Sequence, residues 1–338
     1  MIKKLLAVII VAAIVIAVGS QYVLSQIKQY VELPVNIEQA QIITVPAGSG
    51  FSRALILLQE KQWIGDTPFA RLLPKLYPEL TQIKAGTYQI RPEMSLYDVL
   101  VLFNEGKEHQ FSITFVEGSQ FKEWIEQIAN EPYLIHKLEG LSEEEIAKQL
   151  DVPYTKLEGL FLAETYHYTM GTSDIELLKR AHSKLNKILD KHWQSRQEKL
   201  PLQSAYEALI LASIIEKETA IDDERERIAS VFINRLNKGM RLQTDPTVIY
   251  GLGEHYDGNI RKKDLRTPTP YNTYVINGLP PTPIAMAGEA SIQAALNPEK
   301  NSHYLYFVAS GKGGHVFSKT LAEHNSAVRA YLRELRKK

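Results

Sequence analysis

The sequence contains no cysteine, carries no net charge and has only one long hydrophobic run. Without cysteine, disulfide bonds, thiolate zinc sites and thiol nucleophiles are excluded. The 39 Lys and Arg residues balance 39 Asp and Glu residues, so no global positive field favours a nucleic-acid partner. The 338 residues, 44% of them hydrophobic, can form a well-buried core and more than one domain.

Motifs for metal or nucleophilic serine chemistry are also missing. The scattered histidines form neither a His-x-x-x-His pair nor an H-E-x-x-H helix, and no G-x-S-x-G elbow occurs. The glycine-rich stretch after Tyr304–Val308, a predicted strand, lacks the phosphate-binding loop pattern and favours a hairpin turn. We therefore expect neither a metal ion nor a cofactor.

The one long hydrophobic run lies at the N-terminus. Lys3 and Lys4 precede an apolar stretch from Leu5 to Leu24, close to the roughly 20 residues that cross a bilayer as a helix. The lysines predict that residues 1–4 stay in the cytoplasm, that residues 5–25 span the membrane and that the rest is exported. A cleaved signal peptide is the alternative, since Ala17-Val18-Gly19 resembles a cleavage site.

The exported part divides by pattern into three segments. Residues 26–40 are predicted to form a polar stalk. Residues 41–105 predict a small α+β unit, with strands near 42–46 and 84–90, helices over 52–62 and 68–76, and a further helix from Ser95. This order is similar to that of the glycan-binding LysM module. Residues 106–338 predict a larger mixed α/β domain, which includes a mainly helical segment over 119–200. There the Ser142–Glu145 and Ser173–Glu176 pairs have capping-box spacing and predict helices over about 143–150 and 174–193.

The strongest chemical signal is a glutamate at the end of an apolar helix over 209–219. At about 100° per residue, Glu218 falls on the stripe of Leu211, Ile214 and Ile215, whereas Glu216 projects to the opposite side. Apolar neighbours raise the pKa of a carboxyl group and make it a usable proton donor. The alternative is that both glutamates begin a solvated helix end.

Two nearby stretches combine amide, hydroxyl, carboxylate and aromatic groups. The first contains Gln243, Thr244, Asp245 and Tyr250, and the second begins with Tyr271 and Asn272. Such groups can hydrogen-bond sugar hydroxyls and N-acetyl groups, while a tyrosine ring can cover the apolar face of a sugar. A proline-directed turn capped by Asp245 is the alternative for the first stretch.

These stretches carry a resemblance to a known family. Seven motifs carry it: Ile215–Thr219, Ser230–Leu236, Leu242–Gly251, Tyr271–Tyr274, Lys84–Tyr88, Val116–Gly118 and Gly278–Pro281. Together they closely resemble the motifs of the YceG-like endolytic murein transglycosylases. The resemblance implies a single-pass inner-membrane protein with a LysM-like subdomain and a periplasmic catalytic domain. Its implied partners are peptidoglycan glycan strands, the lipid bilayer and cell-wall synthases.

The resemblance also implies roles for individual residues. Glu218 matches the catalytic glutamate, which protonates the bond between N-acetylmuramic acid and N-acetylglucosamine in nascent strands and leaves a 1,6-anhydro end. Where the family usually has Phe-Pro-Asp/Glu-Thr-Tyr, this chain has Phe161-Leu162-Ala163-Glu164-Thr165-Tyr166 and lacks the proline. Glu164 and Tyr166 remain as expected substrate-binding residues of a loosened groove loop.

Two other functions are compatible with the same residues. A membrane-anchored scaffold would bind glycan through residues 41–105, position synthases and cleave nothing. A hydrolytic muramidase would need a second carboxylate, such as Asp245, within about 5–9.5 Å of Glu218. The products distinguish the three functions, because a transglycosylase leaves anhydro ends and a hydrolase leaves reducing ends.

Overall fold

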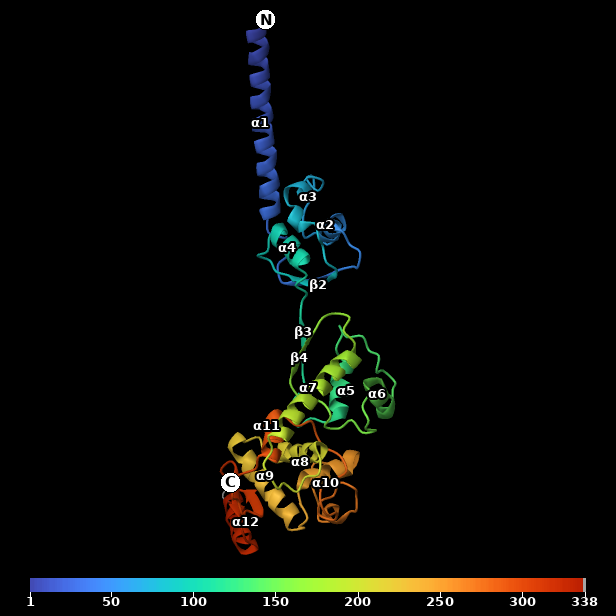
Figure 1. The fold of residues 1–338 in the computed structure, drawn as a ribbon, viewed down its shortest axis with the longest axis vertical. Helices are drawn as coiled ribbons and strands as arrows, with labels where there is room; N and C mark the ends of the chain where they lie inside the picture. The colour runs from blue at the N-terminus through green and yellow to red at the C-terminus, as the bar shows by residue number, and fades with distance from the viewer. Residues whose placement is uncertain (337–338) are drawn as a thin grey trace. The chain divides into compact units, whose positions relative to one another are not determined.

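The structure is a computed structural model that describes residues 1–336, and it contains both helices and strands. The chain forms two compact units, one up to Phe111 and one from Ser112 onward. Figure 1 draws both, and each is described here by itself. We call them the N-terminal unit and the C-terminal unit.

The N-terminal unit begins with a single long helix, α1 (Ile2–Glu32). Its apolar part is exposed along its whole length, and among residues 1–336 it is the one helix long and apolar enough to cross a membrane. The helix continues well past residue 25. Ile27 and Val31, one turn apart on the same face, are buried together with Val35 in the core of this unit. Residues 26–40 therefore do not form the polar stalk that the sequence suggested.

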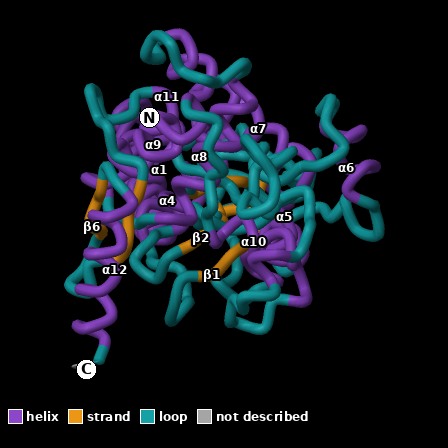
Figure 2. Tube along the Cα trace, turned by 90° about the horizontal axis from the view of Figure 1, so that it is seen from below, coloured by secondary structure: helices purple, strands orange, loops and turns teal. Residues whose placement is uncertain are grey.

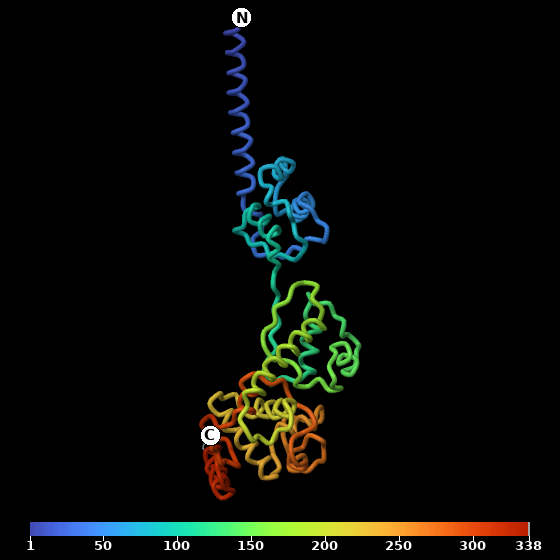
Figure 3. The backbone as a smooth tube through the Cα atoms, in the orientation of Figure 1, coloured from blue at the N-terminus to red at the C-terminus, as the bar shows by residue number. Residues whose placement is uncertain are grey.

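The rest of this unit is a two-stranded sheet with helices, and Figure 3 traces the path of its backbone. β1 (Gln41–Val45) pairs antiparallel with β2 (Gly86–Ile90), and α2 (Phe51–Glu60), α3 (Leu73–Leu76) and a 3-10 turn, η1 (Pro78–Leu80), connect them. α4 (Leu96–Glu105) begins at a Ser95–Asp98 capping box. The helix expected over 68–76 is only one turn long, because prolines at 74 and 78 interrupt the backbone donors that a longer helix needs.

The first part of the C-terminal unit is mainly helical, as expected. β3 (Phe111–Thr114) pairs with β4 (Thr165–Tyr168), and between them lie α5 (Phe121–Ala129) and α6 (Glu143–Leu150). The long helix α7 (Asp174–Gln194) follows. α6 and α7 begin at the Ser142–Glu145 and Ser173–Glu176 capping boxes, which the sequence predicts from the spacing alone.

The second part is built around α8 (Ala205–Glu218), which packs against α7, α9 (Asp222–Asn237), α10 (Asp245–Leu252) and α11 (Glu289–Leu296). Every α8 residue from Ala208 to Ile215 is buried, so this helix is the core of the unit. Two 3-10 turns, η2 (Gly253–His255) and η3 (Asp264–Arg266), lie in the long loop after α10.

A hairpin and a last helix complete this unit. β5 (Tyr306–Ala309) and β6 (His315–Ser318) pair antiparallel, and α12 (Leu321–Leu335) packs against both (Figure 2). Gly311, Gly313 and Gly314 in the connecting turn all have positive φ, a conformation that favours glycine. The glycine-rich stretch is therefore the hairpin turn that its sequence favours.

Candidate active site

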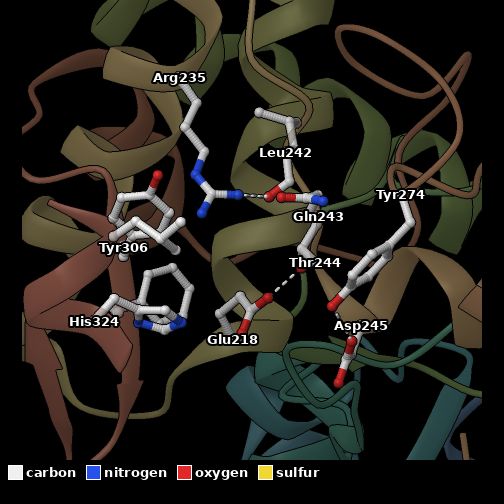
Figure 4. A pocket seen from close by; sticks show the side chains of 11 residues that line it. Glu218, Arg235, Leu242, Gln243, Thr244, Asp245, Tyr274, Tyr306 and His324 are labelled. Carbon is white, nitrogen blue, oxygen red and sulfur yellow. Dashed lines mark hydrogen bonds between the residues drawn. The ribbon is translucent and has the colours of Figure 1, made fainter. Parts of the chain in front are cut away.

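Glu218, the last residue of α8, lines a pocket of about 360 Å³ (Figure 4). The burial of α8 on all sides carries this residue into the unit, and the chain turns away immediately after it at the extended Thr219. Segments from five other parts of the unit complete the lining, which comprises Arg235, Leu242, Gln243, Thr244, Asp245, Tyr274, Tyr306, Phe307, Leu321 and His324.

The surroundings of Glu218 favour a protonated carboxyl group at a higher pH than usual. Burial, with a smaller contribution from the charge of Asp245, raises the pKa of Glu218 to about 7. A hydrogen bond from the Thr244 hydroxyl and the positive charges of His315 and Arg235 act in the opposite direction. A carboxyl group with a pKa near 7 can both donate and accept a proton at neutral pH.

The loop before α10 holds one wall of the pocket in place. Gln243 adopts a left-handed backbone conformation with φ of 51°, and its N–H donates to the carbonyl oxygen of Thr273 at 3.2 Å. The N–H of Thr244 donates to the Thr273 hydroxyl at 3.1 Å. These bonds turn the buried Thr244 hydroxyl toward Glu218. A left-handed non-glycine residue is sparsely populated unless its surroundings impose it, and such residues cluster at functional sites.

We expect the Thr244 hydroxyl to set the upper pH limit of activity. Its hydrogen bond favours the charged form of Glu218, so Thr244→Val should raise the pKa of Glu218 above 7. Since a bond to a charged group is worth about 1.5–3 kcal/mol, the alkaline limb of the kcat profile should move up by about 1–2 pH units. Thr244→Ser keeps the hydroxyl and should keep the profile. An unchanged profile in the valine variant would contradict this role.

The same wall carries a second carboxylate. Asp245 is the first residue of α10, and its Oδ1 accepts a hydrogen bond of 2.7 Å from the hydroxyl group of Tyr274. Tyr274 lines the pocket beside it. The sequence argument selected Asp245 but passed over Tyr274, although Tyr274 ends the motif that begins at Tyr271.

The opposite wall comes from the hairpin and α12, and sequence reasoning missed it. The ring of His324 stacks on Tyr306 at 5.1 Å between centroids. Burial and the charge of Arg235 lower the pKa of His324 and so favour its neutral imidazole. Tyr306 lies in a stretch that the sequence predicts to be a strand, but nothing in that pattern indicates which face meets Glu218.

Arg235 joins the two walls and was also missed. Its buried guanidinium donates to the carbonyl oxygens of Leu305 at 2.7 Å and Leu242 at 2.6 Å. Leu305 precedes Tyr306, and Leu242 precedes the Gln243–Thr244 loop. Arg235 therefore fixes both sides of the pocket while it places a positive charge near Glu218. In the sequence Arg235 is one of several arginines in the α9 segment, and its position along the helix does not distinguish it from an arginine exposed to solvent.

The other predicted substrate-binding residues do not line this pocket. The hydroxyl of Tyr250 donates to Glu158 at 3.3 Å, and its ring meets that of Tyr271 edge-on at 4.7 Å. Asn272 is buried, and its amide donates to the carbonyl oxygens of Asp264 and Thr267. Its side chain therefore fixes the η3 loop.

Glu164 lies just before β4, and Tyr166 lies within it. Glu164 forms an ion pair with Lys184 of α7. Tyr166 is buried and donates to the carbonyl oxygen of Leu162 at 2.8 Å. Ala163, at the position where the family proline is missing, is also buried. The local chain here is thus held by core packing.

Glu158 is a buried carboxyl group that sequence reasoning did not single out. Burial raises its pKa to about 7, against hydrogen bonds from the Phe121 N–H at 3.1 Å and the Tyr250 hydroxyl. It therefore connects the start of α5 to α10, the helix that begins with Asp245.

Glu216 faces away from the pocket, as predicted, but it is not solvated. Its side chain is only 6% exposed, and its Oε2 accepts a hydrogen bond of 3.0 Å from the N–H of Gly288, before α11. The guanidinium of Arg225, from α9, lies 3.9 Å from its Oε1. The alternative of a solvated helix end is therefore wrong for Glu216, because α9 and α11 cover that side of α8.

The charged residues of the described chain do not suggest a metal site. Within residues 1–336, no three His, Asp or Glu side chains gather closely enough to hold a metal ion. The chemistry available in the pocket is proton transfer by Glu218, with hydroxyl, amide and aromatic groups around it.

Comparison with known proteins places this geometry in a family. Residues 43–330 match the YceG-like family. The chain is 35% identical over 307 residues to a protein of Bacillus subtilis named endolytic murein transglycosylase, covering 86% of this chain and 84% of that protein. A protein of Streptococcus pneumoniae with the same name is 27% identical over 334 residues, and the match covers 88% of this chain but 59% of that longer protein.

A solved structure supports the same assignment. The crystal structure of a putative yceG-like protein from Listeria monocytogenes has a TM-score of 0.52 and 34% sequence identity, covering 86% of this chain and 99% of that one. Sequence and fold thus agree over most of the chain, and we conclude that this protein belongs to the YceG-like family.

Proposed function

We propose that this protein is a membrane-anchored lytic transglycosylase that cuts peptidoglycan glycan strands internally. The observation that carries the proposal is Glu218, a carboxyl group with a raised pKa in a pocket lined by hydroxyl, amide and aromatic groups. The name shared by the relatives from Bacillus and Streptococcus supports the same reaction and substrate.

In this reaction Glu218 acts first as an acid and then as a base. Its proton passes to the glycosidic oxygen between N-acetylmuramic acid and N-acetylglucosamine, and the bond from that oxygen to the anomeric carbon breaks. The 6-hydroxyl oxygen of the muramyl sugar then bonds to the anomeric carbon, and its proton passes to the Glu218 carboxylate. The product is a 1,6-anhydro ring, no water is consumed, and Glu218 ends protonated as it began.

The neighbours of Glu218 suit both halves of this cycle. Burial and Asp245 keep the carboxyl protonated for the first step, while Arg235 and the Thr244 hydroxyl stabilise the carboxylate that the step leaves behind. General acid–base help of this kind is worth about 10²–10⁴-fold in rate. The rest must come from holding the 6-hydroxyl near the anomeric carbon, which we assign to Gln243, Asp245 and Tyr274.

Hydrolysis is a second candidate because Asp245 lines the same pocket. A muramidase would use Asp245 to activate a water or to form a glycosyl intermediate. The hydrogen bond from Tyr274 occupies one oxygen of Asp245 and favours a positioning role instead.

Anchoring and glycan binding are the remaining parts of the proposal. We infer that α1 crosses the inner membrane with residues 1–4 in the cytoplasm, which places the C-terminal unit on the periplasmic side. We also infer that residues 41–105 form a LysM-like glycan-binding subdomain, on the basis of their order β1, α2, α3, β2. If residues 41–105 bound glycan but the C-terminal unit cleaved nothing, the protein would be a scaffold.

The test is mass spectrometry of peptidoglycan incubated with the full chain in detergent micelles. The full chain is needed because Ile27 and Val31 belong to the core of the N-terminal unit. Fragments with 1,6-anhydromuramyl ends would support the proposal. Reducing ends would support the muramidase instead, and binding without any fragments would support the scaffold.

A further inference from the structure

α1 joins the N-terminal unit without a flexible connection. Its last turns lie in the core of that unit, and the ring of Tyr30 contacts Phe69, just before α3, at 6.4 Å. The chain leaving α1 is also fixed, because the N–H of Leu96 donates to the carbonyl oxygen of Leu33 at 3.1 Å. The orientation of this unit is therefore tied to that of α1.

Four exposed apolar side chains of this unit lie on neighbouring segments. They are Leu33 (53% exposed), Leu72 (39%), Leu76 (41%) and Tyr97 (36%), whereas the exposed Ile56 (43%) lies apart on α2. Leu33 follows α1 and is hydrogen-bonded to Leu96, Leu72 precedes α3, Leu76 ends it, and the ring of Tyr97 meets that of Tyr77 at 5.9 Å. We call these four residues the apolar rim.

Basic side chains accompany the apolar rim. Arg71 and Lys75 are exposed and alternate with Leu72 and Leu76 along the chain, while Leu73 between them is buried and holds the turn to the core. Apolar side chains interleaved with Lys and Arg are typical of segments that lie in the interface between lipid and water.

Only the α3 part of the rim lies near the level where the proposed span leaves the bilayer. If the hydrocarbon ends near Leu24, Tyr30 lies about 9 Å beyond it at 1.5 Å per residue, just past a headgroup layer roughly 5–8 Å thick, and Leu33 lies farther out. Figures 1 and 3 show the segment around α3 extending along α1 toward its N-terminus, farther than the rest of this unit. That segment is therefore the part of the unit nearest to the lipid.

We propose that the N-terminal unit docks on the membrane surface through Leu72 and Leu76 of the apolar rim, with Arg71 and Lys75 facing the lipid headgroups. This inference rests on the proposed anchoring by α1. Continuity with α1 selects the bilayer as the occupant of this surface, because the segment around α3 extends back along the helix that is proposed to enter the bilayer. The unit is then held against the membrane instead of moving freely on a stalk.

Single-cysteine spin labelling tests this docking, and the absence of native cysteine makes each label unique. The full chain is placed in phosphatidylglycerol-containing vesicles, and collision of the label with oxygen is compared with collision with a water-soluble nickel complex. Labels at Leu72→Cys and Leu76→Cys should show a higher oxygen-to-nickel ratio than Gln89→Cys, an exposed position on β2. A label at Lys75→Cys should lose its elevated ratio when Leu72 and Leu76 are both changed to serine.

A label at Val15→Cys separates the two hypotheses. A hydrocarbon-like ratio at Val15 with water-like ratios at Leu72 and Leu76 would overturn docking and leave the anchor intact. A water-like ratio at Val15 would overturn both, because docking depends on the span. An elevated ratio at Lys75 that survives the double serine change would overturn the assignment of the contact to Leu72 and Leu76.

Discussion

Glu218→Gln is expected to reduce glycan cleavage by about 10²–10⁴-fold while binding to peptidoglycan persists. Glutamine has nearly the same shape and can still accept the hydrogen bond from Thr244, but it has no acidic proton to give to the glycosidic oxygen. The measurement is the rate of release of anhydro-ended fragments, together with sedimentation of the protein with insoluble peptidoglycan.

The stability of the same variant shows whether the loss is chemical. Burial raises the pKa of Glu218 in the folded protein to about 7, so its contribution to stability is present below the unfolded pKa near 4.5 and is lost as the pH rises through 7. Glutamine does not titrate, so the Glu218→Gln variant does not lose stability in this way. The melting temperature of Glu218→Gln relative to the wild type should therefore be higher at pH 8 than at pH 5.

Glu216→Gln is the matched control, because it changes the other carboxylate of the same helix end. Glu216 contacts Gly288 and Arg225 and does not line the pocket, so cleavage by the folded variant should stay within a few-fold of wild type. Full activity in Glu218→Gln, or equal losses in the two variants, would refute the assignment of acid and base to Glu218.

Glu216→Ala is expected to cost about 2–4 kcal/mol of folding free energy. The substitution leaves the N–H of Gly288 without its acceptor and removes the carboxylate that lies 3.9 Å from the guanidinium of the buried Arg225. A buried donor without a partner costs about 1–3 kcal/mol, and breaking a buried charge pair costs about 3–5 kcal/mol. The exposed Asp222 still pairs with Arg225, which keeps our value at the lower end.

Thermal and denaturant unfolding of the full chain would measure this cost. Since 1 kcal/mol shifts the melting temperature of a unit of this size by about 2–4 °C, a decrease of roughly 5–15 °C is expected. The kcat of the protein that remains folded should be unchanged. A stable Glu216→Ala variant with reduced kcat would instead place Glu216 in the reaction.

Several features of this protein follow from local pattern. The exposed apolar helix α1 follows from composition, and the starts of α6 and α7 follow from Ser–Glu spacing, because a capping box needs only residues three positions apart. The 3.6-residue period also separates Glu218 from Glu216 without any knowledge of the fold. Each of these inferences depends on residues that are neighbours along the chain.

Tertiary structure decided what surrounds those residues. Arg235, Tyr306 and His324 meet Glu218 from segments up to about a hundred positions away, Glu216 is buried by α9 and α11, and Ile27 lies in a core instead of a stalk. Periodicity indicates which side of an element is apolar, but it cannot indicate which distant element covers that side. The sequence alone therefore selected the glutamate, while packing between remote segments set its pKa and built the pocket around it.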